Sequence, residues 1–148
     1  MTASDRILGI DYGSKRIGIA ISDPLKILAQ GLGVVPNSPA APSEIAEIVS
    51  RYGVNLIVVG MPLTLKGEVG HAGSGVRAFM DHLSKATGVE VVEWDERFTS
   101  RTAHDTLLEM GVKKKRRASK EIIDTMAAAL ILQGYLDRRK KISSESNS

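Results

Sequence analysis

Residues 7–21 read ILGIDYGSKRIGIAI, and this stretch decides the fold. Apolar residues dominate both of its ends, and the turn-prone DYGS at positions 11–14 separates them, so the pattern predicts a hairpin of two β-strands. In the second strand, isoleucines alternate with Gly18 and Ala20. One face of that strand is therefore bulky, and the other is small enough for a covering element to approach closely.

The rest of the chain alternates between the apolar spacings of strands and of helices. Further strands are predicted within 27–35, at 56–60 and at 89–94, and helices at about 43–53, 76–87, 100–110 and 119–137. Three strands followed by alternating helices and strands predict an α/β fold with a mixed five-stranded sheet. We expect one domain over residues 1–148, with a disordered polar tail from about 142 to 148.

The composition excludes several classes of protein. With 43% hydrophobic and 25% charged residues, the chain is typical of a globular domain, and no apolar run approaches the roughly 20 residues that span a bilayer. The polar start, Met1 to Asp5, lacks the pattern of a signal peptide. Because there is no cysteine, disulfides, thiolate zinc sites and cysteine nucleophiles are excluded, and we expect a cytoplasmic protein without a membrane partner.

Positive charge is concentrated near the C-terminus. Residues 113–141 hold ten of the twenty lysines and arginines but only three acids, a net charge of +7, which leaves −4 for the remainder. Such a basic segment is expected of a protein that neutralises nucleic-acid phosphates. A solvated helix face followed by a frayed tail explains the charge equally well.

Acidic residues follow two of the predicted strands. Asp11 ends the first strand, and Asp95 with Glu96 ends the fifth, at the edge where ligands bind in open α/β sheets. Asp11 also suits a turn that hydrogen-bonds its own backbone, and the Asp95–Glu96 pair suits a helix cap. For that cap, however, Thr99 or Ser100 is better placed, so the paired acids are left without a structural task.

A third acid lies within the last predicted helix. Asp124 shares a helical row with Ala128 and Ile131, so it sits on or beside the packed face. A carboxylate there needs a partner, either Lys120 one turn earlier or a metal ion. Carboxylates without cysteine or paired histidines favour Mg²⁺ or Mn²⁺, and such a cluster beside a basic segment suits hydrolysis of phosphodiester bonds.

Four motifs together resemble the bacterial YqgF family, also called RuvX. They are GIDYGSKRIGIA at 9–20, GMPL at 60–63 with Gly67, DERFTS at 95–100, and Ile123-Asp124 with Ala127-Ala128 and Ile131-Leu132-Gln133. The match covers nearly the whole chain in order. It implies a ribonuclease H-like fold related to Holliday junction resolvases, and a nuclease that matures the 5′ end of the precursor of small-subunit (16S) ribosomal RNA.

The resemblance also assigns roles to residues. It implies a catalytic metal site formed by Asp11, Glu96 and Asp124, with Asp95 as the rival for the middle place. Other matched positions, Lys15, Arg16 and Arg97, are expected to contact nucleic acid, although Arg97 is equally suited to holding a carboxylate. The basic run is expected to be exposed and to bind the phosphate backbone of nucleic acid without contacting bases. It comprises Lys113, Lys114, Lys115, Arg116 and Arg117.

Rival functions remain open at this point. An ATPase of the actin and sugar-kinase type has a similar phosphate-binding hairpin, but its two lobes do not fit in 148 residues. A Holliday junction resolvase acting on branched DNA and a non-catalytic module that binds RNA or ribosomal particles both fit the sequence. The sequence also leaves open endonuclease against exonuclease action and a monomer against a homodimer. A 4% aromatic content argues against recognition by stacking of single-stranded bases.

Overall fold

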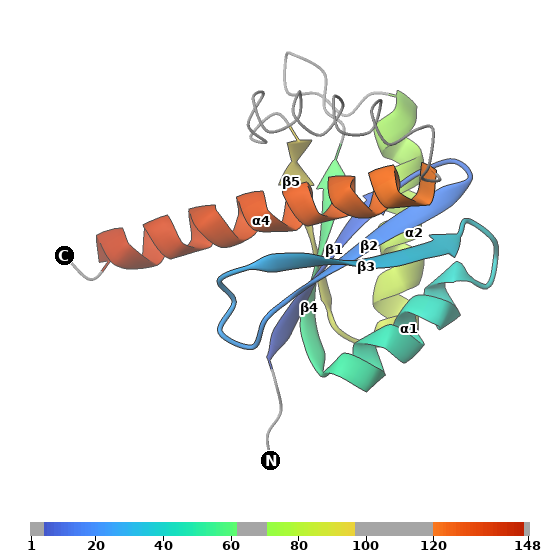
Figure 1. Cartoon of the computed structure of the whole chain (residues 1–148). Coiled ribbons are helices and arrows are strands. Elements are labelled where there is room, and N and C mark those ends of the chain that lie inside the picture. Colours follow the sequence, from blue (N-terminus) through green and yellow to red (C-terminus); the bar gives the residue numbers. More distant parts are fainter. Residues whose placement is uncertain (1–4, 62–70, 97–119, 147–148) are drawn as a thin grey trace.

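The computed structural model describes residues 5–61, 71–96 and 120–146. Their strands form one mixed five-stranded sheet in the order β3-β2-β1-β4-β5 (Figure 1). The strands are β1 Arg6–Tyr12, β2 Arg16–Ser22, β3 Ala29–Pro36, β4 Val54–Met61 and β5 Glu90–Asp95. β2 pairs antiparallel with both β1 and β3, whereas β4 lies parallel to both β1 and β5. The predicted hairpin and the mixed five-stranded sheet are therefore confirmed.

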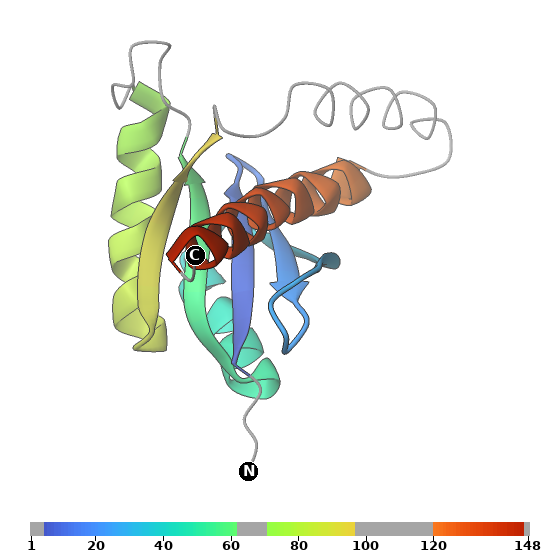
Figure 2. The same cartoon turned by 90° about the vertical axis from the view of Figure 1, so that its left-hand side faces the viewer.

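Helices cover both faces of this sheet. Those described are α1 Ala41–Tyr52, α2 His71–Thr87 and α4 Lys120–Ser146. α1 and α2 pack on one face, and α4 crosses the other (Figure 2). α1 begins two residues before the predicted Ser43, because Pro42 is tolerated in the first turn of a helix, and it ends at Gly53 in the left-handed conformation (φ 67°). The helix predicted at 100–110 lies outside the described residues.

The last helix is longer than the sequence indicated. Its predicted end was at about Asp137, with a disordered tail from 142, whereas α4 continues to Ser146. The prediction was wrong because the basic residues after Asp137 carry no apolar periodicity, although lysine and arginine are good helix formers. Within the described ranges, no helix is long and apolar enough to span a membrane.

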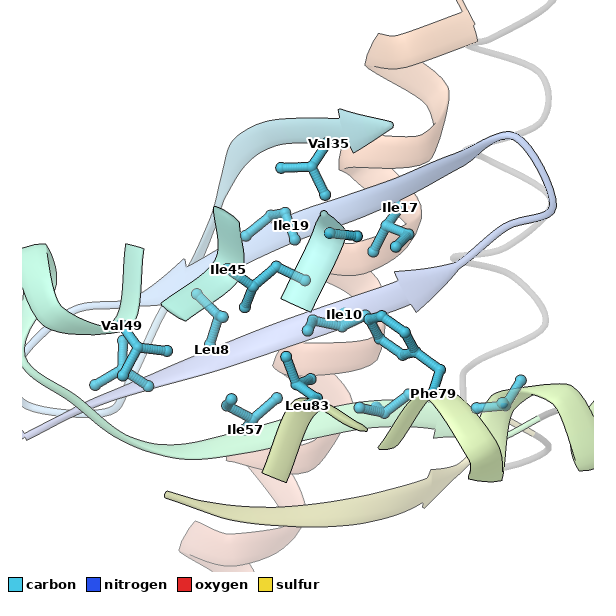
Figure 3. Close-up of a cluster of buried hydrophobic side chains, with 14 of the residues drawn as sticks. Leu8, Ile10, Ile17, Ile19, Val35, Ile45, Val49, Ile57, Phe79 and Leu83 are labelled. Carbon is cyan, nitrogen blue, oxygen red and sulfur yellow. The ribbon is translucent and has the colours of Figure 1, made fainter. Parts of the chain in front are cut away.

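Each face of the sheet has its own hydrophobic core. Isoleucines Ile17, Ile19 and Ile21 of β2 pack into the core beneath α1 and α2, and Figure 3 shows the first two among its side chains. On the other face, Ala20 packs with α4 residues such as Ala128. The predicted division of β2 into a bulky face and a small face is therefore confirmed, and the small face is the one that α4 covers.

Glycines in four adjacent strands let α4 lie directly against the sheet. A Cβ atom at Gly9 would lie 2.6 Å from Leu132 Cβ, which no side chain tolerates without movement. A Cβ at Gly18 would meet the backbone carbonyl oxygen of Asp124. Similar conflicts arise at Gly31 and Gly60. The row of glycines therefore fixes how closely α4, and Asp124 with it, approaches the first hairpin.

Candidate active site

Asp11 lies near the end of β1, on the face that α4 covers. It pairs with Gly18 across the antiparallel β1–β2 ladder, so the two residues point to the same side of the sheet. A side chain at Gly18 would point at the backbone carbonyl of Asp124, so Asp11 and Asp124 lie on the same face of the hairpin. The charge of Asp124 accordingly raises the pKa of Asp11.

Glu96 joins this site from the end of β5. Its Cγ atom would lie 3.3 Å from a Cβ at Gly60, a glycine of the α4 face. Asp95 pairs instead with Met61, whose side chain belongs to the core under α1 and α2, and partners in register share a face. Alternation along the strand therefore turns Glu96, and not Asp95, towards Asp11.

Burial and mutual repulsion disfavour ionisation of these acids. The pKa of Asp11 rises to about 6, first because the carboxyl is buried and second because Asp124 is near. Burial raises the pKa of Glu96 to about 7, with further contributions from the charges of Asp11 and then Asp95. Each group influences the next, so the carboxylates of Asp11, Asp124 and Glu96 form one electrostatic cluster.

Asp124 has a partner that the sequence did not indicate. Its Oδ2 atom accepts a hydrogen bond from Arg16 Nε at 2.9 Å, and both side chains are about 30% exposed (29% and 30%). Sequence reasoning offered Lys120 or a metal ion, and the side chain of Lys120 lies outside the described residues. Arg16, which was expected to contact nucleic acid, thus engages the cluster of acids directly.

The structure describes only some of the other residues that are predicted to bind nucleic acid. Lys15 is exposed in the turn between β1 and β2, adjacent to the cluster of acids. Asn37 secures this turn by donating hydrogen bonds from its side-chain amide to the Gly13 carbonyl (2.7 Å) and from its backbone to the Lys15 carbonyl (3.0 Å). Arg97 and the run from Lys113 to Arg117 lie outside the described residues.

The donor chemistry of the cluster suits a divalent cation. In the part of the chain that the structure describes, no three histidine, cysteine, aspartate or glutamate side chains are already arranged to hold a metal ion. One oxygen of Asp124 is engaged by Arg16. A hard divalent cation would nevertheless stabilise the ionised forms of Asp11 and Glu96 that burial disfavours, and their oxygen atoms are the ligands that Mg²⁺ and Mn²⁺ prefer.

Comparison with known proteins places the chain in a family. Residues 5–138 match the family described as "RuvX: Holliday junction resolvase". The chain belongs to the RuvX family. Similar proteins from Acetivibrio thermocellus (45% identity, covering 93% of this chain and 99% of the relative) and Moorella thermoacetica (45%, covering 90% and 95%) carry the name "Putative pre-16S rRNA nuclease". The family predicted from the motifs is confirmed.

Solved structures support the fold assignment of this RuvX-family chain. It is similar to RuvC of Thermus thermophilus in complex with a Holliday junction substrate, with a TM-score of 0.57, 17% identity, and 90% and 96% of the two chains covered. The fowlpox virus Holliday junction resolvase gives a TM-score of 0.51 at 14% identity, with 90% and 99% covered. These likenesses confirm the predicted ribonuclease H-like fold.

Proposed function

We propose that this chain is a metal-dependent nuclease that processes the 5′ end of precursor 16S rRNA. Membership of the RuvX family confirms the predicted reaction class, a hydrolase acting on phosphodiester bonds. The observation that carries the catalytic assignment is the convergence of Asp11, Glu96 and Asp124 on the α4 face, where the pKa values of Asp11 and Glu96 are raised. Buried acids with perturbed pKa values at the end of parallel strands are typical of catalytic sites.

Asp11, Glu96 and Asp124 would hold Mg²⁺ or Mn²⁺. When bound, the ions supply an activated water and stabilise the leaving oxygen of the phosphodiester. Asp11 and Glu96 must first release their protons, which the raised pKa values place near neutral pH. Arg16 positions Asp124 by holding Oδ2, and the second carboxylate oxygen stays available for a ligand bond.

Substrate binding would rest on cations around the cluster of acids. Lys15 is exposed in the turn that follows Asp11, where it is placed to contact a phosphate. We assign backbone contacts to Arg97 and to the basic run from Lys113 to Arg117 on the strength of charge and of the family motifs. We also propose a cytoplasmic location and contact with ribosomal particles, where precursor rRNA is processed.

A second candidate is cleavage of Holliday junctions. The family description names this activity, and the structural likeness is to junction resolvases. A resolvase cuts two strands symmetrically and therefore acts as a two-fold dimer. A non-catalytic RNA-binding module is the third candidate, and it predicts binding without any cleavage.

One assay separates the three candidates. The purified chain is incubated with precursor 16S rRNA and with a synthetic four-way junction, each with Mg²⁺, with Mn²⁺ and with chelator. We expect metal-dependent cleavage of the RNA at its 5′ leader and none by Asp11→Asn. Paired symmetric cuts in the junction alone would establish the resolvase, and binding without cleavage in every condition would contradict the nuclease assignment.

A further inference from the structure

A cavity of about 430 Å³ lies between the C-terminal half of α4 and the end of β5, beside the cluster of acids. Its volume is within the range of about 300–1,000 Å³ that is usual for small-ligand sites. The residues that line it are Met61, Glu93, Trp94, Asp95, Tyr135, Arg138, Arg139 and Ile142. None of the roles assigned above uses this cavity.

The wall formed by α4 combines an aromatic ring with two cations. Tyr135, Arg138, Arg139 and Ile142 follow one another at helical spacing, so they form a single stripe that faces the cavity. Tyr135 meets Trp94 edge to face, with ring centroids 6.3 Å apart and planes at 84°. Trp94 is only 6% exposed and forms the floor, whereas Tyr135 is half-buried and contributes to the wall.

The polar groups of the cavity match a nucleotide. The guanidinium groups of Arg138 and Arg139 are suited to a phosphate, and the aromatic surface is suited to a base. The carboxylate of Glu93 accepts a hydrogen bond from Arg77 Nε of α2 at 2.9 Å, so the polar recognition in the cavity is assigned to Arg138 and Arg139. Although aromatic residues make up only 4% of the chain, two of them meet here.

The cavity and the candidate active site are built on neighbouring residues of β5 and on the same helix, α4. Asp95 lines the cavity, and the next residue, Glu96, belongs to the cluster of acids. A strand whose phosphodiester bond is held at that cluster is therefore placed to extend a neighbouring nucleotide into the cavity. A base can reach the aromatic surface only when it is unpaired and unstacked from its neighbours.

We propose that this cavity binds one unpaired nucleotide of the substrate strand, with its base against Tyr135 and Trp94 and its phosphate on Arg138 and Arg139. The inference rests on the proposed nuclease function for the identity of the strand. It narrows the substrate to nucleic acid that is single-stranded beside the cut, as in an RNA leader, and disfavours a fully paired junction arm.

Trp94 is the only tryptophan of the chain and serves as an intrinsic probe of the cavity. Its fluorescence is followed in chelator while a short single-stranded oligoribonucleotide, a duplex of the same sequence or a nucleoside monophosphate is added. We expect saturable quenching by the single strand, weaker binding of the monophosphate and no quenching by the duplex. Equal quenching by the duplex, or tighter binding of the monophosphate than of the strand, would overturn the proposal.

Two double variants, each of which removes two positive charges from α4, distinguish binding in the cavity from general electrostatic attraction. Arg138→Ala with Arg139→Ala removes cavity cations, whereas Lys140→Ala with Lys141→Ala removes two exposed cations of the same helix that do not line the cavity. We expect at least a tenfold loss of single-strand affinity for the first pair and about threefold or less for the second. Equal losses of single-strand affinity in the two double variants would mean that the nucleic acid binds a nonspecific basic surface and not the cavity.

Substitution of Tyr135 tests the stacking surface itself. Tyr135→Leu keeps an apolar side chain and should weaken binding by between about fivefold and a hundredfold, while Tyr135→Phe should retain it. Unchanged binding by both variants would contradict the base site. Quenching in chelator combined with no cleavage of the RNA after Mg²⁺ or Mn²⁺ is added would refute only the nuclease function, and cleavage without quenching would refute only the cavity.

Discussion

Arg16 Nε lies 2.9 Å from Asp124 Oδ2, so a cation of the first hairpin neutralises the acid of the last helix. Near it, the half-buried acids Asp11 and Glu96 have raised pKa values. Asp124 therefore already has a cationic partner in Arg16, whereas the ionised forms of Asp11 and Glu96 would be stabilised by a bound cation.

Removing Arg16 should strengthen metal binding. In Arg16→Met, Asp124 loses its competing partner and a bound divalent ion loses a nearby positive charge, so Mn²⁺ affinity measured by calorimetry should rise roughly tenfold. Lys15→Met is the matched control, because it removes a neighbouring exposed cation, and it should change affinity less. Weaker metal binding by Arg16→Met would mean that Arg16 chiefly orients Asp124.

Asp11 and Asp124 should differ in their effects on stability, although both are needed for cleavage. Asp11→Asn removes a buried charge and should raise the stability of the metal-free protein at neutral pH. Asp124→Asn breaks a partly exposed ion pair and should cost no more than about 1 kcal/mol. Urea unfolding measures both effects, and cleavage assays should show loss of activity with nucleic-acid affinity retained.

The control for this comparison is Asp81→Asn, which removes an acid from an exposed pair with Lys85 on α2. Its cleavage rate should match that of the unsubstituted protein. Strong destabilisation by Asp124→Asn, together with no gain of stability on adding metal to the unsubstituted protein, would contradict the assignment of Asp124 to a metal site.

The metal-free protein should become less stable as the pH rises from about 4 to about 7. The pKa values of Asp11 and Glu96, about 6 and about 7, lie above their ordinary values of 3.8 and 4.5. Across this window the unfolded chain has already released protons that the folded chain still holds, so raising the pH favours unfolding. Unfolding free energies in chelator should therefore fall with pH, and the double variant Asp11→Asn, Glu96→Gln should flatten the curve. An unaltered slope would show that other groups govern the dependence.

The contact between Gly18 and α4 should tolerate no side chain. In Gly18→Ala, the new methyl group meets the backbone carbonyl of Asp124, which cannot rotate away, so we expect a loss of at least about 1–3 kcal/mol and impaired metal binding. Gly75→Ala is the control, because nothing lies within 4 Å of its added Cβ and alanine favours the α2 helix by up to about 1 kcal/mol. Equal unfolding midpoints for the two variants would refute the close approach.

Salt should weaken nucleic-acid binding through the basic run. Neutralising Lys113, Lys114, Lys115, Arg116 and Arg117 together should flatten the dependence of the association constant on salt concentration. Filter-binding titrations at several salt concentrations measure the slope. If the slope is unchanged, phosphate contacts are made by other cations.

The sequence predicts those features that depend on local pattern. The alternation of isoleucine with Gly18 and Ala20 predicts both the hairpin and the face that α4 covers, because side chains alternate along a strand. The choice between Asp95 and Glu96 could not be made, since it depends on the register of β5 with β4. Arg16 could not be paired with Asp124, because the two residues are 108 positions apart and only docking of α4 brings them together.

The end of α4 shows the limit of apolar periodicity. Ile142 is exposed and isolated among charged residues, so its spacing from Tyr135 predicts neither a longer helix nor the wall of a cavity. The cavity itself arises only where the helix passes β5. Its lining therefore combines residues that no single sequence motif contains.

The docking of α4 against the first hairpin has a consequence for the protein during its own synthesis. Asp11 and Arg16 are synthesised more than a hundred residues before Asp124 and the helix that holds it. Until Asp124 has been synthesised and α4 has docked, a nascent chain carries an incomplete set of acids, so under the proposed function it should be unable to cut RNA.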